Sequence, residues 1–170
     1  MVLTEGDIQF TVPDQTNWTK PDAVGHNGLK AVDFIIETET CFLFLELKDA
    51  DHPLATSNAQ EVFYQKYRSK QLTFDLSQKL KDTILYHWAC DFLFSKPVKY
   101  IVILEFARID DAMRGPLGES IKGYLPLRLE AEPSVHRQIL SGFELLDLRR
   151  WNKFYAQYPA VRLSEAVAAQ

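Results

Sequence analysis

The sequence lacks any apolar run long enough to cross a lipid bilayer. A membrane-spanning helix needs roughly 18 consecutive apolar residues, and charged residues such as Glu46, Asp91 and Glu105 interrupt the longest apolar stretches. The N-terminal residues MVLTEGDIQF also lack the basic stretch followed by a long apolar stretch that is typical of a secretory signal. We therefore expect a cytoplasmic protein that does not enter the membrane.

Cysteine is scarce as well, since the 170 residues include only Cys41 and Cys90. Cys41 lies in a strand-like run and Cys90 in a helix-like run, and their separation does not match the spacing of metal ligands. We therefore predict two buried, reduced thiols rather than a disulfide or a zinc site.

Several motifs that define common enzyme classes are missing. The sequence contains no GxxxxGK(S/T) phosphate-binding loop, no GxGxxG dinucleotide fingerprint, no GxSxG nucleophile elbow and no paired CxxC. Internal repeats, low-complexity tracts and long Gly/Ser linkers are also missing. Because 46% of the residues are hydrophobic and 12% are aromatic, the chain can bury a sizeable core. We expect residues 1–170 to form a single domain.

The charged residues are unevenly distributed along the chain. The net charge is −4, and residues 1–52 carry ten acidic and three basic side chains, whereas residues 53–100 carry four acidic and seven basic ones. Non-specific affinity for duplex DNA comes largely from cations that displace counter-ions, so the acidic balance argues against a module that only binds DNA. It argues less against a metal-dependent enzyme, because such a site concentrates carboxylates and takes positive charge from the bound ion.

Hydrophobic periodicity predicts an α/β fold. Five segments have the alternation or the apolar runs of β-strands, and the segment CFLFLELK at 41–48 is apolar enough to be a central strand. One long helix is predicted to begin at Asp75 or Ser77 and to end near Phe94, and a short helix is predicted within 108–123. The five predicted strands are 7–12, 31–37, 41–48, 99–106 and 143–148.

The long helix connects two of these strands. Its apolar residues recur at four-residue steps, so we expect Trp88 and Phe92 to lie in the core. A strand–helix–strand passage usually joins parallel neighbours by a right-handed crossover, so the strands 41–48 and 99–106 should be parallel. Because the strands 31–37 and 41–48 suit an antiparallel hairpin, the sheet is predicted to be mixed.

Three shorter segments complete the prediction. Turn-forming residues fill 13–29, and a polar stretch with interleaved aromatic residues at 56–70 forms either a short helix or an ordered loop. Near the C-terminus, Asp147 is placed to cap an amphipathic turn of helix that contains Trp151.

Two acidic residues and one lysine stand out at the ends of the predicted hairpin. Asp33 lies at the start of one strand, and Glu46 and Lys48 lie at the end of the other. Because side chains alternate along a strand, Glu46 and Lys48 point to the same face, and the pairing of the strands can bring Asp33 to that face. Adjacent carboxylates repel unless a cation neutralises them, and Mg²⁺ prefers oxygen ligands. The pattern predicts a site for a divalent ion.

The segments KAVDF and FLELK resemble the (P)D…(D/E)xK signature of the PD-(D/E)XK, or restriction-endonuclease-like, nuclease superfamily. Asp33, Glu46 and Lys48 match its three positions, and Val32 replaces the proline. The resemblance, which covers about residues 30–106, implies a restriction-endonuclease-like core with a central mixed β-sheet flanked by helices, often in a homodimer. It also implies a metal-dependent nuclease that binds Mg²⁺ or Mn²⁺ through Asp33 and Glu46, with Lys48 orienting the attacking water or stabilising charge in the transition state.

The resemblance also suggests residues that would support the site. In such folds the helix after the ExK strand frequently supplies a polar residue, and Gln78 and Lys79, in the first turn of the predicted helix, are the candidates. Many members add a glutamate from an N-terminal helix, which is not predicted here, so Glu5 is a weaker candidate. Asp22 and His26 precede the motif and are further candidates, although a local hydrogen bond in the loop is the simpler role for His26.

A basic stretch with interleaved aromatic residues follows the hairpin. Its cations, together with Lys79, are candidates for contacts to the phosphates of nucleic acid, and its rings are candidates for stacking on bases. A solvated face with core aromatics explains the same pattern equally well. The cations are Lys66, Arg68 and Lys70, and the aromatic residues are Phe63, Tyr64 and Tyr67.

Three interpretations remain open at this point. The first is a Mg²⁺- or Mn²⁺-dependent nuclease acting on nucleic acid, with Asp33, Glu46, Lys48 and Gln78 in its catalytic site. The second is a non-catalytic member of the same fold that binds nucleic acid or a protein partner, which the acidic balance and the missing additional glutamate favour. The third is an unrelated α/β binding domain in which the spacing of the motif is accidental.

Overall fold

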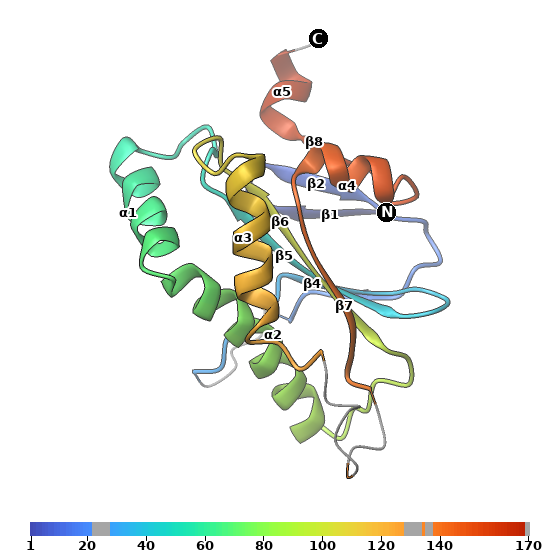
Figure 1. Cartoon of the computed structure of the whole chain (residues 1–170). Helices are drawn as coiled ribbons and strands as arrows, with labels where there is room; N and C mark the ends of the chain where they lie inside the picture. Colours follow the sequence, from blue (N-terminus) through green and yellow to red (C-terminus); the bar gives the residue numbers. More distant parts are fainter. Residues whose placement is uncertain (22–27, 128–133, 135–137, 169–170) are drawn as a thin grey trace.

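The structure is a computed structural model that describes residues 1–21, 28–127, 134 and 138–168. A five-stranded sheet with the order β3-β4-β5-β6-β7 lies at the centre, and a three-stranded sheet has the order β1-β2-β8 (Figure 1). The strands are β1 (Val2–Glu5), β2 (Ile8–Thr11), β3 (Trp18–Thr19), β4 (Phe34–Glu37), β5 (Phe42–Asp49), β6 (Val98–Glu105), β7 (Leu140–Leu146) and β8 (Ala160–Arg162). The helices are α1 (Ser57–Arg68), α2 (Gln71–Ala89), α3 (Asp111–Lys122), α4 (Leu148–Phe154) and α5 (Leu163–Ala168).

The central sheet is mixed, as predicted. β4 and β5 form an antiparallel hairpin in which Phe34 pairs with Leu45. β5 and β6 are parallel neighbours joined through α1 and α2, and β6 and β7 are parallel neighbours joined through α3. The predicted passage from the hairpin through a helix to a parallel strand is therefore confirmed, and β5 is a central strand.

Alternation of side chains gives the central sheet two different faces. On one face, Phe44 of β5 shares a hydrophobic cluster with Leu76 of α2 and with residues of α3. On the other face, Leu45 shares a cluster with the three-stranded sheet and α4. Trp151 of α4 is fully buried in this second cluster, and its ring stands edge-on to that of Phe10 at 5.5 Å. The central sheet thus separates a layer of helices from a layer made by the small sheet and α4 (Figure 1).

The polar stretch that precedes α2 forms a helix, α1, rather than an ordered loop. Thr56 caps its start, because the hydroxyl accepts a hydrogen bond from the backbone N–H of Ala59 at 3.2 Å. Phe63 and Tyr64 lie on the inner side of α1, where both rings contact the ring of Phe106. These two aromatic residues are half-buried and pack against the hydrophobic cluster beneath α1.

α2 begins earlier than predicted. The chain turns from α1 into α2 at Lys70, whose backbone has a left-handed φ of 62°. The helix starts immediately after this residue instead of at Asp75 or Ser77. Gln78 and Lys79 consequently lie about two turns inside the helix, not in its first turn.

The C-terminal end of α2 also differs from the prediction. The helix ends at Ala89, and Asp91 turns the chain with a φ of 57°. Trp88 and Phe92, which were predicted to be core residues, are 63% and 46% exposed. A step of four residues advances about 40° beyond one full turn, so a stripe that is buried at Leu80 rotates away from the sheet before it reaches Trp88.

Three further points complete the comparison with the sequence. Cys41 and Cys90 are free, as predicted, but Cys90 is exposed and Cys41 is half-buried, so the predicted burial of both thiols is wrong.

Asp147 does cap α4, since its carboxylate accepts a hydrogen bond from the backbone N–H of Arg150 at 2.6 Å. Over the ranges that the structure describes, no helix combines the length and the apolar character of a membrane span.

Candidate functional site

The pairing of β4 with β5 places Asp33 next to Glu46. Phe34 pairs with Leu45, so Asp33, one residue before β4, stands opposite Glu46. The backbone N–H of Asp33 donates a hydrogen bond to the Leu45 carbonyl at 3.0 Å, which holds this residue in the ladder. In return, the N–H of Leu47 donates to Oδ2 of Asp33 at 2.6 Å. Both carboxylates therefore lie on one face of the hairpin, as predicted.

Lys79 of α2 joins the two carboxylates. Its Nζ lies 3.2 Å from Oδ1 of Asp33 and 2.7 Å from Oε1 of Glu46. Lys48 contacts the same Glu46 oxygen and also donates to the Leu47 carbonyl at 3.0 Å. The three motif residues and Lys79 thus form one group. We call it the carboxylate–lysine cluster, and its members are Asp33, Glu46, Lys48 and Lys79.

Burial makes the carboxylates of this cluster sensitive to charge. Glu46 is fully buried and Asp33 is only 4% exposed. Burial, opposed by Lys48 and reinforced by the charge of Asp33, raises the pKa of Glu46 from 4.5 to about 7. Burial disfavours the charged form of Lys79, but the attraction of Glu46 and Asp33 outweighs it, so the pKa of Lys79 lies above its usual value. Near neutral pH the cluster therefore combines a carboxyl group that is changing its charge, Glu46, with the charged ammonium of Lys79.

One oxygen of the cluster has no partner. Within the described part of the chain, Oε2 of Glu46 is buried and makes no hydrogen bond. Leaving a buried acceptor unsatisfied costs about 1–3 kcal/mol, and such groups in folded proteins usually have an explanation in function or in a bound species. Oε2 is therefore the atom of the cluster that is best placed to accept a further ligand.

Tyr100 lies beside the cluster on the neighbouring strand β6. Its hydroxyl is fully buried and donates a hydrogen bond to the Leu76 carbonyl of α2 at 2.9 Å. Burial, followed by the charges of Glu46 and Asp33, raises the pKa of Tyr100 well above its usual value. Sequence reasoning missed this residue, although its position in an apolar strand parallel to β5 would have identified it as a neighbour of the site.

Side chains of α2 close to Lys79 form hydrogen bonds with the backbone of the segment that precedes Asp33. Gln78, a predicted catalytic residue, donates a hydrogen bond to Asp82 at 2.5 Å and not to the cluster. Asp82 in turn accepts from the backbone N–H of Lys30 at 3.0 Å. The next residue of α2, Thr83, accepts a hydrogen bond through its hydroxyl from the backbone N–H of Val32 at 3.0 Å. These contacts assign Gln78 and Asp82 to positioning of the motif.

The other predicted residues that the structure describes do not contact the cluster. Glu5, at the end of β1 in the small sheet, pairs with Lys20 at 2.6 Å. Asp22 and His26 lie outside the residues that the structure describes. The cations Lys66, Arg68 and Lys70 are exposed at the end of α1 and at its junction with α2.

The cluster has carboxylate oxygens that could ligate a metal ion, and only a small part of it is accessible to solvent. Lys48 and Lys79 are 27% and 21% exposed, so the cluster reaches solvent along these two side chains. Oxygen-only ligation suits Mg²⁺ and Mn²⁺, and Asp33 and Glu46 provide it. In the described ranges, however, no group of three or more His, Cys, Asp or Glu side chains is arranged to hold a metal ion. Asp33 and Glu46 are therefore the only two carboxylates of the cluster that could ligate such an ion, and water would have to complete its coordination.

Comparisons of this chain with protein families, with curated proteins and with solved structures found no match. The function must therefore be argued from the chemistry of the cluster and from the order of the elements that carry it.

Proposed function

We propose that this protein is a metal-dependent nuclease that hydrolyses phosphodiester bonds in nucleic acid. The observation that carries the proposal is the convergence of Asp33 and Glu46 on a single cation, the Lys79 ammonium, with Lys48 on the same carboxylate. Two buried carboxylates from adjacent strands, with a lysine two residues after the second, make up the arrangement that the (D/E)xK resemblance implies.

The order of the elements supports a restriction-endonuclease-like core. The β4–β5 hairpin carries the motif, α2 follows it, and β6 and β7 extend the sheet in the parallel direction. A helix packed on the hairpin face then contributes a polar residue to the site. In this chain the residue is Lys79 rather than Gln78, because only Lys79 contacts the two carboxylates.

Asp33 and Glu46 would hold one Mg²⁺ or Mn²⁺. When bound, such an ion polarises a phosphate group and lowers the pKa of a coordinated water. Glu46 contributes the unpartnered Oε2, and Asp33 is held in place by the Leu47 N–H. The hydrogen bond from the Leu47 N–H thus holds the Asp33 carboxylate on the face of the hairpin that also carries the Glu46 carboxylate.

The two lysines take different roles. Lys48 is the more exposed of the pair, so its ammonium is placed to orient an attacking water or to stabilise negative charge on the phosphate in the transition state. Lys79 binds Oδ1 of Asp33 and Oε1 of Glu46. An ion held by Oε2 of Glu46 and Oδ1 of Asp33 would compete with Lys79 for the Asp33 oxygen, and Lys79 acts as a positioning residue that keeps the carboxylates together.

The exposed cations of α1 provide a surface for the substrate. Lys66, Arg68 and Lys70 gather where α1 meets α2, the helix that carries Lys79. Cations of this kind position nucleic acid through its phosphates and carry little sequence information. Stacking of bases is less suited to this surface, because Phe63 and Tyr64 face the core and Arg108 lies 4.0 Å from the ring centre of Tyr64.

A second function is favoured by the charge balance of the cluster. Two carboxylates face two ammonium groups, Lys48 and Lys79, so the cluster neutralises itself. If the two lysines take the place of a metal ion, the protein is a non-catalytic member of the same fold that binds nucleic acid or a protein partner. The absence of metal binding would distinguish this module from the nuclease.

Cleavage assays test the proposal. Labelled single- and double-stranded DNA and RNA are incubated with Mg²⁺ or Mn²⁺ and with wild type, Lys48→Met, Asp33→Asn or Lys81→Met. The last variant is a matched control, because Lys81 is an exposed lysine on the same helix as Lys79. Wild type and Lys81→Met should cleave at least one substrate, and the other two variants should be slower by about 100-fold or more.

Calorimetric titration with Mn²⁺ separates the two functions. Wild type should bind the ion, and Asp33→Asn should bind it far more weakly while unfolding cooperatively like wild type. Undiminished metal-dependent cleavage by Lys48→Met would refute the role of that residue. If wild type binds no Mn²⁺ and Asp33→Asn behaves identically, the nuclease proposal fails and the interaction module takes its place.

A further inference from the structure

Lys79 reaches the carboxylate–lysine cluster from a helix, whereas the two carboxylates that it contacts come from the hairpin. Asp33 and Glu46 are brought together within the hairpin itself, because the backbone N–H of Asp33 donates to the Leu45 carbonyl and the N–H of Leu47 donates to Oδ2 of Asp33. The position of Lys79, in contrast, is set by α2. The distance between its ammonium and the carboxylates therefore depends on how α2 is attached to the segment that carries Asp33.

The hydroxyl of Thr83 connects α2 to this segment. Its Oγ1 donates a hydrogen bond to the backbone carbonyl of Lys79 at 2.7 Å. The same Oγ1 accepts a hydrogen bond from the backbone N–H of Val32 at 3.0 Å. One oxygen atom thus joins the backbone of Lys79 to the residue next to Asp33, and Lys79 and Asp33 are themselves an ion pair at 3.2 Å.

A second α2 hydroxyl shows what is unusual about Thr83. Serine and threonine in helices often donate a hydrogen bond to the carbonyl four residues earlier, and Ser77 does so to Thr73 at 3.0 Å. The described hydrogen bonds of the Ser77 hydroxyl all stay within α2. The Thr83 hydroxyl gives its one proton to the helix and uses a lone pair for a donor from outside the helix.

Burial makes this contact hard to replace. Thr83 is 1% exposed and Val32 is fully buried, so bulk water does not reach the bond between them. A buried N–H that loses its acceptor bears the full cost of desolvation. Another contact, the bond from the Tyr100 hydroxyl to the Leu76 carbonyl at 2.9 Å, also attaches α2 to the sheet. Thr83 differs from it because its partner in the helix is the backbone of the lysine of the cluster.

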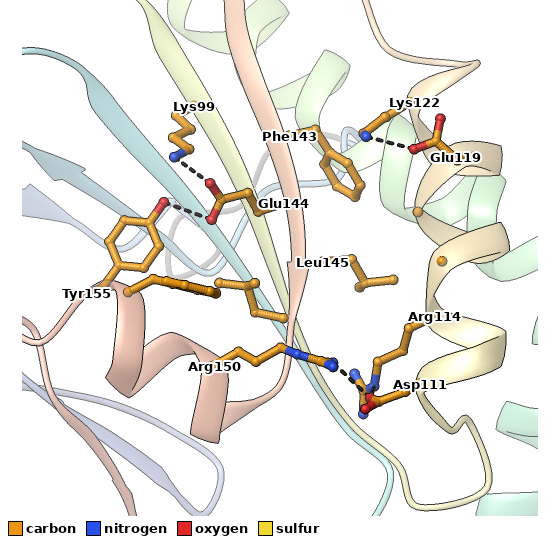
Figure 2. A pocket seen from close by; sticks show the side chains of 14 residues that line it. Lys99, Asp111, Arg114, Glu119, Lys122, Phe143, Glu144, Leu145, Arg150 and Tyr155 are labelled. Carbon is orange, nitrogen blue, oxygen red and sulfur yellow. Dashed lines mark hydrogen bonds and ion pairs between the residues drawn. The ribbon is translucent and has the colours of Figure 1, made fainter.

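Other ion pairs of this protein are less constrained because they lie near solvent. In the cavity of about 670 Å³ that is lined by β7, α3 and α4, Arg150 pairs with Asp111 at 2.9 Å and Lys122 pairs with Glu119 at 2.8 Å (Figure 2). The side chains of these two carboxylates are 64% and 73% exposed, so water can solvate them when a pair opens. The carboxylates that face Lys79 are 6% and 0% exposed, so water cannot take the place of its ammonium in the same way.

We propose that Thr83 is a positioning residue that holds Lys79 against Asp33 and thereby raises the concentration of divalent ion needed to load the cluster. An ion that binds Oδ1 of Asp33 must displace the ammonium from that oxygen, and displacement is harder while the helix is held in place. The effect on loading rests on the proposed metal site, whereas the contact between Thr83 and Lys79 exists without it.

Titration with Mn²⁺ tests the effect on loading in wild type, Thr83→Val, Lys79→Met and the double variant. Thr83→Val keeps the branched shape and loses only the hydroxyl, so it should bind Mn²⁺ about fivefold more tightly than wild type. In the Lys79→Met background the same substitution should change the affinity by less than about twofold, because no ammonium is left to position. A purely structural role of the hydroxyl would instead weaken binding, or act equally in both backgrounds.

Two further variants are matched controls. Thr83→Ser keeps the hydroxyl, and Ser77→Ala removes one that bonds only within α2 in the described structure, so both should bind Mn²⁺ as wild type does. Unchanged or weaker binding by Thr83→Val, or equal tightening in both backgrounds, would overturn the inference. If the double variant does not fold, the comparison of Thr83→Val with Thr83→Ser decides, and equal affinities of these two variants would overturn it.

Unfolding without metal distinguishes a failure of this inference from a failure of the proposed nuclease. Urea unfolding of the same four proteins in a chelator gives a double-mutant cycle. Thr83→Val should raise the unfolding equilibrium constant at least about threefold less in the Lys79→Met background than in wild type. Additive effects would overturn the coupling between Thr83 and Lys79. Non-additive effects in a protein that binds no Mn²⁺ would support the positioning of Lys79 and overturn the metal site, together with its regulation.

Discussion

Lys79 and Glu46 form an ion pair in which Nζ lies 2.7 Å from Oε1, and Glu46 is fully buried. The same ammonium lies 3.2 Å from Oδ1 of Asp33. Removing one member of a buried ion pair is far more costly than the net stabilisation that the pair provides, because the remaining charge loses both water and its partner. When both carboxylates are ionised, the stability of the cluster therefore depends on the positive charge that Lys79 places between them.

Lys79→Met should destabilise the metal-free protein by about 3 kcal/mol, because two buried carboxylates lose their shared counter-charge. Mn²⁺ should restore part of this loss and should bind more tightly to the variant than to wild type. Urea unfolding with and without Mn²⁺ measures both effects. Lys81→Met should stay within about 0.5 kcal/mol of wild type in either condition. An identical response to Mn²⁺ in wild type and Lys79→Met would contradict the competition between ion and lysine.

The raised pKa of Glu46 predicts that stability falls as the pH rises. Between its ordinary pKa of 4.5 and the folded value of about 7, Glu46 holds a proton in the folded state that the unfolded state releases. The contribution of Glu46 to the free energy of unfolding, measured as the difference between wild type and Glu46→Gln, should therefore decrease by up to about 3 kcal/mol from pH 4.5 to pH 7 and level off above that range. Urea unfolding across this range should show the decrease, and Glu46→Gln should remove it. A slope that persists in Glu46→Gln must come from another group.

Arg162 should be critical for the attachment of the small sheet. It extends from β8 to Asp49 at the end of β5, with two hydrogen bonds of 2.7 and 2.9 Å, and both side chains are nearly buried. Arg162→Met should reduce the free energy of unfolding by about 3 kcal/mol, and Arg162→Lys should recover little, because it cannot bind the carboxylate through two nitrogens. The exposed pair Lys122–Glu119 provides a control, since Lys122→Met should change stability by less than about 1 kcal/mol.

Leu80 and Trp88 lie two four-residue steps apart on α2 and should respond very differently to substitution. Leu80 is fully buried, so Leu80→Ala should cost about 2–5 kcal/mol. Trp88 is 63% exposed, so Trp88→Ser should change the free energy of unfolding by about 0.5 kcal/mol or less. Denaturant unfolding measures both, and a loss at Trp88 comparable to that at Leu80 would show that this end of the helix is covered in solution.

The hairpin and its charged ends could be predicted from the sequence because they follow local rules. Alternation along a strand fixes which side chains share a face, and the pairing of two neighbouring strands fixes the rest. Asp33, Glu46 and Lys48 therefore meet where the pattern predicts. The metal and the nuclease activity remain predictions, because no local rule distinguishes a metal site from an ion pair.

The contact between Lys79 and the carboxylates could not be predicted in the same way. It depends on where α2 starts, and the start is set by the left-handed Lys70 rather than by a capping side chain. Asp75 and Ser77 resemble caps but lie inside the helix, where Asp75 pairs with Lys30 and Ser77 bonds to the preceding turn. Of the small sheet only β2 was predicted, as the strand 7–12. β1 and β8 were missed, because these short strands leave weak periodicity and β8 pairs with β2 across most of the chain.

Lys79 also has a consequence for the loading of the proposed metal site. Many small metalloproteins acquire their native structure only when an ion draws the ligands together. Here the chain carries its own positive charge on α2, so the protein should reach the native state without an ion and should still unfold cooperatively in the presence of a chelator. Loading would then depend on the concentration of free divalent ion in the cell, with the lysine setting the threshold.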